Sequence, residues 1–335
     1  MNTRQMRAVV SGLLAAVVAG CGPTAYKITP IPIDEELQET IVYSDRGVLL
    51  PKIALIDLDG MILNARESSL LGKGENPTAL VVEKLQKASR DPQVKAVVLR
   101  INSPGGGVTA SHIIYRHVLE LRNGNEAKGL AGKPVVTSMM DVAASGGYYI
   151  ACGTNEIYAE SSTITGSIGV LMLTFNGKGL LDKIGITTDA IKSGPNKDAG
   201  SPFRPMKPEE RQIFQGMIDQ FYGQFVDVVA KGRPKLTKDQ ICKLADGRVY
   251  SGRSAAELGL VDKIGSLDEA IDRARELAGV EKAKVVMYHR PVGYKGNIYS
   301  STEPMDVQSS SSPLININAS ELLGRQGTFM YLWQP

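Results

Sequence analysis

The chain has 335 residues, with 38 Lys or Arg and 35 Asp or Glu, and its three cysteines are too few for a disulfide framework. Loss of an N-terminal signal carrying Arg4 and Arg7 leaves 36 basic against 35 acidic side chains. This balance argues against a basic nucleic-acid-binding surface or a polybasic membrane patch, so we expect no nucleic-acid partner.

The first twenty residues have the composition of a processing signal. Two arginines precede an apolar stretch over residues 8–19, which is too short to span a bilayer. Val18-Ala19-Gly20-Cys21 resembles a lipobox, so residues 1–20 are predicted to be a lipoprotein signal peptide and Cys21 to carry the lipid anchor. A secretory signal with a different cleavage site is the alternative.

Residues 21–50 contain three early prolines and are predicted to form a tether between the lipid and the folded part. A folded domain is predicted over 51–284. It opens with a strand at 53–59, and strand and helix patterns then alternate, which indicates a largely parallel α/β fold. Residues 285–335 are predicted to be a strand followed by a flexible, serine-rich tail.

Two predicted strands end in glycine-containing turns. The first, Val94–Ile101, runs into Asn102-Ser103-Pro104-Gly105-Gly106-Gly107 and a helix from about Val108. A Walker loop is excluded because no Gly-Lys-Ser/Thr follows, and contiguous glycines do not fit the dinucleotide fingerprint. The turn therefore favours an oxyanion pocket made of main-chain N–H groups.

The second turn follows an apolar strand over 134–140 and places Ser145 before an apolar helix. Gly146 and Gly147 let backbone N–H groups approach a substrate closely. This arrangement exposes a nucleophile, although an ordinary serine N-cap before a buried helix is the alternative.

A serine nucleophile needs a base, and the chain has three histidines, His112, His117 and His289. Five residues apart on a helix, the first two point about 140° from one another, so they are not a metal pair. No zinc spacing is present, and no metal or cofactor is expected. A lysine is the leading candidate, but composition does not choose among those after the serine: Lys178, Lys183, Lys192, Lys197 and Lys207. Lys197 stands out only because it lies in a tight polar loop leaving a predicted strand over 186–191.

Four motifs in this order resemble the signal peptide peptidase A family of Ser-Lys proteases of the bacterial envelope. They are Asn-Ser-Pro-Gly-Gly (102–106), Ala-Ser-Gly-Gly-Tyr-Tyr (144–149), Thr-Gly-Ser-Ile-Gly (165–169) and Ser-Gly-x-x-Lys-Asp (193–198). The resemblance covers roughly residues 50 to 280, including Asp246–Gly252 and Ala256–Asp262. It implies a spiral of β-β-α units, as in Clp protease and crotonase, with additional C-terminal helices.

The resemblance assigns the nucleophile to Ser145 and the general base to Lys197. It assigns the oxyanion donors to the N–H groups of Gly105 and Gly146, and the hydroxyl that orients the base to Ser167. It also implies a ring-shaped homo-oligomer in which the serine and the lysine of one site come from neighbouring protomers. Many members of the family carry an N-terminal transmembrane helix. This chain differs from them in having a lipobox instead.

A free lysine has a pKa of about 10.4, so a lysine base requires a buried, dry site. We therefore expect the Asp198 carboxylate to point away from Lys197 and to be structural. Cys152 and Cys242 are both predicted to be buried thiols rather than a disulfide. Helices are predicted over 208–231 and 267–278, and the apolar cluster 329–333 is expected to dock, on a neighbouring protomer rather than near a substrate groove.

The sequence thus predicts a lipid-anchored, extracytoplasmic serine endopeptidase that cleaves remnant signal peptides or other unfolded peptides through an acyl-enzyme. One alternative is a crotonase-type acyl-thioester enzyme, which has similar oxyanion loops but binds coenzyme A. Another is a non-catalytic assembly scaffold, in which Ser145 would not react with serine-directed probes.

Overall fold

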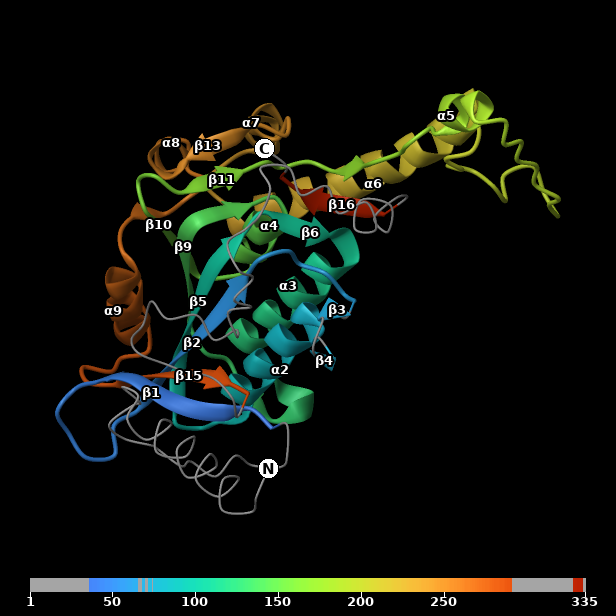
Figure 1. Cartoon of the computed structure of the whole chain (residues 1–335). Coiled ribbons are helices and arrows are strands. Elements are labelled where there is room, and N and C mark those ends of the chain that lie inside the picture. Colours follow the sequence, from blue (N-terminus) through green and yellow to red (C-terminus); the bar gives the residue numbers. More distant parts are fainter. Residues whose placement is uncertain (1–35, 66–67, 70–71, 74, 291–327, 334–335) are drawn as a thin grey trace, which may run out of the picture. The chain divides into compact units, whose positions relative to one another are not determined.

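The computed structural model describes residues 36–65, 68–69, 72–73, 75–290 and 328–333. A nine-stranded sheet dominates them, in the order β1-β15-β2-β5-β9-β10-β14, with β11 beside β9 and β13 beside β11 (Figure 1). Its central strands are parallel neighbours: β2 (Lys52–Asp59), β5 (Val94–Ser103), β9 (Val135–Ala144) and β10 (Glu156–Ala159). The predicted α/β class is confirmed.

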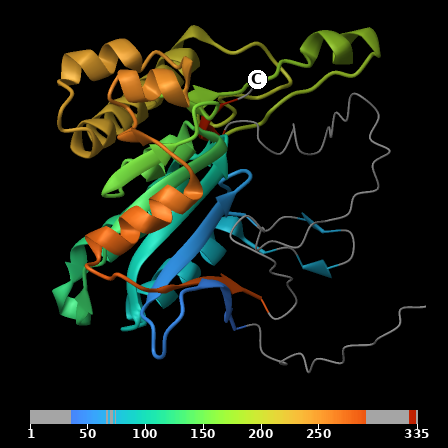
Figure 2. The ribbon, with the colours of Figure 1, turned by 90° about the vertical axis from the view of Figure 1, so that its left-hand side faces the viewer.

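The central strands are apolar along most of their length because helices cover both faces of the sheet. One face is buried under three helices, α2 (Pro77–Arg90), α3 (Val108–Asn123) and α4 (Gly146–Ala151). Figure 2 shows α9 (Leu267–Leu277) lying along the strands of the opposite face, where Ala270, Ile271 and Ala274 are buried. Alternate residues of β5 therefore enter two different apolar cores.

The sheet extends beyond the predicted limits of 51–284 at both ends. β1 (Gln38–Ser44) pairs antiparallel with β15 (Lys284–His289), and β15 is parallel to β2. Part of the predicted tether is thus an edge strand of the sheet. The predicted signal peptide, the lipobox and Cys21 lie outside the described residues.

A long helix, α6 (Pro208–Gly232), and a short one, α5 (Lys178–Lys183), carry an arm that leads away from the sheet (Figure 1). The prediction of a strand over 186–191 is wrong, because these residues form no strand. Its apolar residues have no neighbouring strand within the described chain, and Ile186 and Ile191 are 47% and 105% exposed. An alternating pattern becomes a strand only where another backbone pairs with it.

The predicted C-terminal apolar cluster forms β16 (Phe329–Leu332), which docks on its own chain. It lies between β6 (Gly105–Gly107) and β12 (Leu171–Met172) and is antiparallel to both. The expectation that it packs on a neighbouring protomer is therefore corrected, because three of its four residues are buried within this chain. The glycine turn and the C-terminal segment form one small sheet.

The remaining elements are short. They are β3 (Ser68–Ser69), β4 (Gly72–Lys73), β7 (Gly124–Asn125), β8 (Leu130–Ala131), β11 (Ile164–Gly166), α7 (Lys238–Leu244), β13 (Val249–Ser251), α8 (Gly252–Glu257), β14 (Lys263–Ile264) and the 3-10 turn η1 (Glu126–Lys128). None of the helices in the described part of the chain is long and apolar enough to cross a bilayer. Cys152 is a buried free thiol whose pKa burial raises to about 11, whereas Cys242 is exposed, which corrects its predicted burial.

Candidate active site

Ser145 is the single residue between β9 and α4, since the strand ends at Ala144 and the helix begins at Gly146. Its φ of 52° and ψ of −114° are rare for a residue with a side chain, and such strain is typical of functional positions. The residue is 1% exposed, and its hydroxyl has no hydrogen-bond partner among the described residues. Because buried polar groups are usually hydrogen-bonded, this unpartnered hydroxyl marks Ser145 as a candidate functional residue.

Ser167 lies beside Ser145 because the two serines leave adjacent parallel strands at the same level. β11 pairs with β9 so that Gly166 faces Ala144, and the N–H of Ser145 donates to the Gly166 carbonyl at 2.8 Å. Ser167 also has a positive φ, of 49°, and is 7% exposed. Its own N–H donates to the Arg248 carbonyl at 2.8 Å, which ties this turn to the segment before β13.

The glycine turn after β5 closes over Gly146. A Cβ atom on Gly105 would lie 2.6 Å from the Gly146 nitrogen, and Gly105 has a φ of 99°, so only glycine fits there. The Gly105 N–H donates to Ser103 Oγ at 3.1 Å, and that hydroxyl donates to the Gly60 carbonyl at 2.6 Å. Ser103 therefore holds the turn so that the two predicted oxyanion residues are neighbours.

Lys197, the predicted base, is not part of this cluster within the chain. It is exposed, its N–H donates to the Gly194 carbonyl at 3.2 Å, and no contact between described residues joins it to Ser145. The segment that carries it belongs to the arm beside α5, away from α4 (Figure 1). The structure thus brings together Ser145, Gly146, Gly105 and Ser167 but leaves the lysine outside.

Ion pairs fix the loop around Lys197. The Asp198 carboxylate accepts from Arg204 Nε at 2.8 Å and from Lys192 Nζ at 2.6 Å, and these two bonds lower the pKa of Asp198. Arg204 also pairs with Glu210 in the first turn of α6. Both Asp198 oxygens are engaged away from Lys197, as expected from the sequence.

A cavity of about 560 Å³ adjoins Ser167 and is open to solvent. Its walls come from the turn after β11, from α6, from the segment before β13 and from the C-terminal segment: Ser167, Ile168, Gly169, Val170, Leu171, Ile218, Asp219, Tyr222, Ala245, Asp246, Gly247, Leu332 and Trp333. The sequence did not assign α6 to the site, and it placed the C-terminal segment near a substrate groove only as the alternative to packing on a neighbouring protomer. The apolar run at 329–333 was the signal that pointed to the latter.

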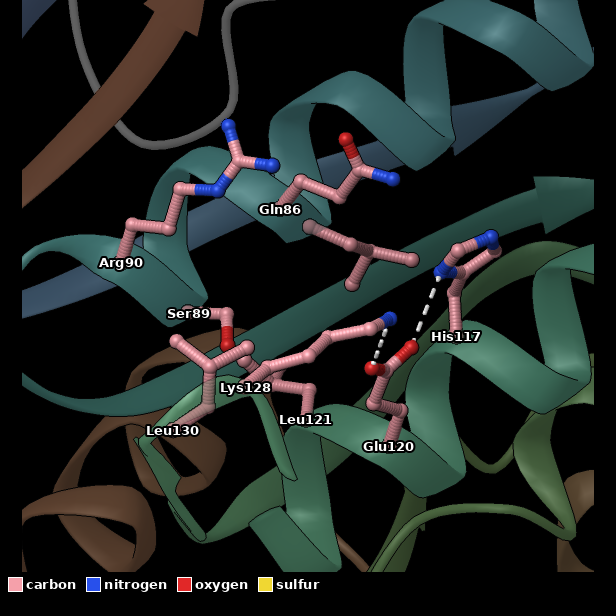
Figure 3. A pocket seen from close by; sticks show the side chains of 9 residues that line it. Gln86, Ser89, Arg90, His117, Glu120, Leu121, Lys128 and Leu130 are labelled. Carbon is pink, nitrogen blue, oxygen red and sulfur yellow. Dashed lines mark hydrogen bonds and ion pairs between the residues drawn. The ribbon is translucent and has the colours of Figure 1, made fainter. Parts of the chain in front are cut away.

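The histidines do not serve this site. His112 Nδ1 lies 2.8 Å from the Tyr149 hydroxyl and 3.0 Å from Gln224 Nε2, so its near nitrogen is engaged. His117 lies 3.6 Å from Glu120, which also pairs with Lys128, in a separate pocket of about 390 Å³ between α2 and α3 (Figure 3). Since the Ser145 hydroxyl has no partner in the described chain, no histidine contacts it there.

The chain matches known peptidases over most of its length. Residues 127–281 match the model of peptidase family S49. A protein of Enterococcus faecium provisionally named signal peptide peptidase SppA is 36% identical over 255 residues, which cover 76% of this chain and 71% of that one. A protein of Synechocystis sp. provisionally named a protease is 40% identical over 234 residues, or 70% of this chain and 77% of its own length.

Protease 4 of Haemophilus influenzae is 39% identical over 226 residues, which cover 68% of this chain and 35% of that protein. The aligned relatives thus include longer proteins of which this chain spans about a third. The residues around Ser145 and the similarity to these proteins lead to one conclusion: the chain belongs to the S49 family of serine peptidases, that of signal peptide peptidase A.

Proposed function

We propose that this peptidase cleaves peptides with a Ser145–Lys197 dyad whose two residues come from different protomers of a homo-oligomeric ring. The observation that carries the proposal is the contrast between the two residues. Ser145 is buried, strained and unpartnered beside two glycine amides, whereas Lys197 is exposed on an arm of the same chain. A lysine acts as a base only when it is neutral, and a dry surrounding favours its neutral form.

The arm has the surface of a segment that another protein covers. Large apolar side chains are exposed along it and along the first turns of α6: Leu180 (66%), Ile184 (60%), Phe203 (52%), Ile213 (43%) and Met217 (40%). Contiguous exposed apolar surface is typical of protein interfaces. A neighbouring copy that covers this surface would also remove water from around Lys197.

The proposed chemistry gives each of these groups one role. Lys197 of one copy takes the proton of the Ser145 hydroxyl of another while Ser145 Oγ attacks the peptide carbonyl carbon. The oxyanion is stabilised by the N–H of Gly146 and by that of Gly105, which gives up its bond to Ser103 Oγ when the oxyanion forms, and Ser167 orients the lysine. The lysine then donates the proton to the leaving amine, which leaves an acyl-enzyme. Water, deprotonated by the same lysine, hydrolyses the ester and restores Ser145.

The substrates of this proposal are unfolded peptides in the bacterial envelope, including remnant signal peptides. The cavity beside Ser167 is open to solvent, and an unfolded peptide would reach it more readily than a folded domain. The chain would act outside the cytoplasm, held at the membrane by lipid on Cys21. These relatives are named as a peptidase and a protease, which favours a peptidase over an acyl-thioester enzyme.

The test uses the protein lacking residues 1–21, in wild-type form and as Ser145→Ala and Lys197→Ala. Each variant alone is expected to lose at least 1000-fold in peptide hydrolysis, because removing either member of a nucleophile–base pair removes the covalent route. Mixing the two variants under conditions of subunit exchange should restore part of the activity. Wild-type turnover in either single variant overturns the assignment, and an inactive mixture of exchanged rings overturns the shared site.

A further inference from the structure

Two adjoining cavities lie between α2, α3 and the hairpin of β7 and β8, away from the Ser145 turn. They have volumes of about 390 and 350 Å³ and share His117, Glu120 and Lys128 in their walls. The helix α3 begins at Val108, directly after the glycine strand, and a rise of 1.5 Å per residue places Glu120 about 18 Å further along its axis. Neither cavity is lined by a residue of the proposed active site.

The larger cavity, which we call the α2–α3 pocket, combines apolar and polar walls. Leu85, Leu121 and Leu130 form its apolar part, and the first two are each 1% exposed. Figure 3 shows polar side chains that face one another across the pocket: Gln86 and Arg90 on α2, and His117, Glu120 and Lys128 opposite. A ligand that fits such a pocket has an apolar group next to a polar or charged one.

The acidic side chain of the pocket is already paired within the chain. Glu120 Oε1 accepts from Lys128 Nζ at 2.5 Å and from Asn125 Nδ2 at 2.8 Å, and Oε2 lies 3.6 Å from His117 Nδ1. The bond from Lys128, followed by that from Asn125, lowers the pKa of Glu120, so this carboxylate is ionised at neutral pH. Glu120 therefore holds Lys128 in place and is not free to bind a cationic ligand.

Two arginines give the two cavities an excess of positive charge. Arg90 lines the α2–α3 pocket and Arg116 lines its neighbour, and both are exposed and form no ion pair with another described residue. Three cationic side chains against the single Glu120 carboxylate leave a net charge of +2, since burial lowers the pKa of His117 and keeps it neutral at pH 7. A planar guanidinium binds a carboxylate through two parallel N–H bonds.

Ser89 supplies an additional donor to the pocket. It lies one turn after Leu85 on the same face of α2, and its Oγ atom is buried and has no hydrogen-bond partner among the described residues. Most buried hydroxyls in folded proteins are hydrogen-bonded. Rotation about the single χ1 bond changes the direction of this hydroxyl, so a ligand oxygen inside the pocket could supply the missing partner.

We propose that the α2–α3 pocket binds a carboxylate that is joined to a compact apolar group. Arg90 and Ser89 bind the carboxylate, and the apolar group packs against Leu85 and Leu121. A peptide that ends in an apolar residue has this chemistry, and so does a short fatty acid. Hydrolysis of a peptide bond leaves a product with a new carboxyl terminus, so products of a serine peptidase belong to this class. The inference does not depend on the proposed roles of Ser145 and Lys197.

The first test is a calorimetric titration of the full chain carrying Ser145→Ala, which prevents cleavage of the probes. The probes are acetyl-alanyl-leucine as the free acid, the same dipeptide as its C-terminal amide, and octanoate. The free acid should bind about 10-fold more tightly than the amide, because only the acid accepts charge-assisted hydrogen bonds. Tighter binding of the peptide acid than of octanoate assigns the pocket to peptide ends, and the reverse order assigns it to fatty acids. Equal affinities for acid and amide, or no binding of any probe, overturn the proposal.

The second test places the bound acid in the pocket. Arg90→Gln should weaken binding of the free acid about 10-fold and leave the amide unchanged, whereas Arg253→Gln, at an exposed arginine of α8 outside the pocket, should affect neither. Ser89→Ala should weaken acid binding about 3- to 10-fold. It should not lower the free energy of unfolding, because the hydroxyl has no partner within the described chain.

Acid binding that is unchanged in both Arg90→Gln and Ser89→Ala would place the ligand elsewhere, including at the Ser145 site, and would overturn the inference. Loss of stability in Ser89→Ala without loss of affinity would overturn the role of its hydroxyl in binding. Neither result bears on peptide hydrolysis, which the single variants of Ser145 and Lys197 test separately.

Discussion

Ser145 and Ser167 are held side by side by the pairing of β9 with β11, which the Ser145 N–H continues by donating to the carbonyl of Gly166. Both serines adopt a positive φ, and both follow directly on paired residues of β9 and β11. Backbone strain at two adjacent turns is costly, and it persists only where the surrounding sheet determines it. The pair therefore marks the edge of the sheet where we propose that the catalytic groups are assembled.

The strain at Ser145 predicts an unusual stability effect. Ser145→Gly and Ser145→Ala both remove the unpartnered hydroxyl, which is the proposed nucleophile, but only glycine adopts a φ of 52° without strain. We expect the glycine variant to be more stable than the alanine variant by about 1 kcal/mol. Urea unfolding measures the difference, and equal or reversed stabilities would contradict strain at this position.

Gly105 is predicted to tolerate no side chain. In Gly105→Ala, the new methyl group would overlap the Tyr331 carbonyl oxygen and approach the Gly146 nitrogen, so peptide hydrolysis should fall at least 100-fold through displacement of the oxyanion donors. Gly129→Ala is the matched control, because Gly129 also has a positive φ but has open space around it. Similar losses in the two variants would mean that backbone strain, and not contact with the site, is responsible.

The ion pairs of Asp198 are predicted to position Lys197. Asp198→Asn weakens the bonds to Lys192 and Arg204, so the loop should hold its lysine less accurately, and kcat should fall about 10-fold with a small change in KM. Asp182→Asn, which breaks an exposed pair with Lys178 on the same arm, should have little effect. Equal activity in Asp198→Asn and the wild type would contradict the prediction that these ion pairs position Lys197.

His112 is predicted to make stability depend on pH. Burial lowers the pKa of His112 below its usual 6.5, and the charge of Arg116 lowers it further. Its neighbours from other helices, the Tyr149 hydroxyl and the Gln224 amide, carry no charge that offsets this. Because the unfolded chain then binds more protons, this contribution to stability is present above pH 6.5 and is lost as the pH falls toward the folded-state pKa.

The measurement compares urea unfolding of the wild type and of His112→Gln at pH 7.5 and at pH 5.5. His117, whose pKa burial also lowers, is present in both proteins, so the difference between them isolates His112. The wild type should lose more stability than the variant on acidification. An equal loss in both would place the proton uptake elsewhere.

Local patterns predicted much of the fold. The helix from Val108 and the helix from Pro208 begin where the sequence places them, and Ser145 lies at the predicted strand-to-helix turn. These features depend on contiguous residues, since glycine conformation, apolar periodicity and strand propensity act over a few positions. Ser145, Gly105, Gly146 and Ser167 were named from their motifs, and the structure brings these four together.

The sequence by itself determined that this is an α/β peptidase with Ser145 at a glycine-flanked turn between a strand and a helix. Only the tertiary structure decided that Gly105 touches Gly146, that β16 lies beside the glycine strand, and that residues 186–191 form no strand. Tyr331 and Gly106 are paired although more than two hundred residues separate them in the chain. Such pairings depend on which strand edges and apolar surfaces remain uncovered when the rest of the chain has folded. No short window of residues contains that information.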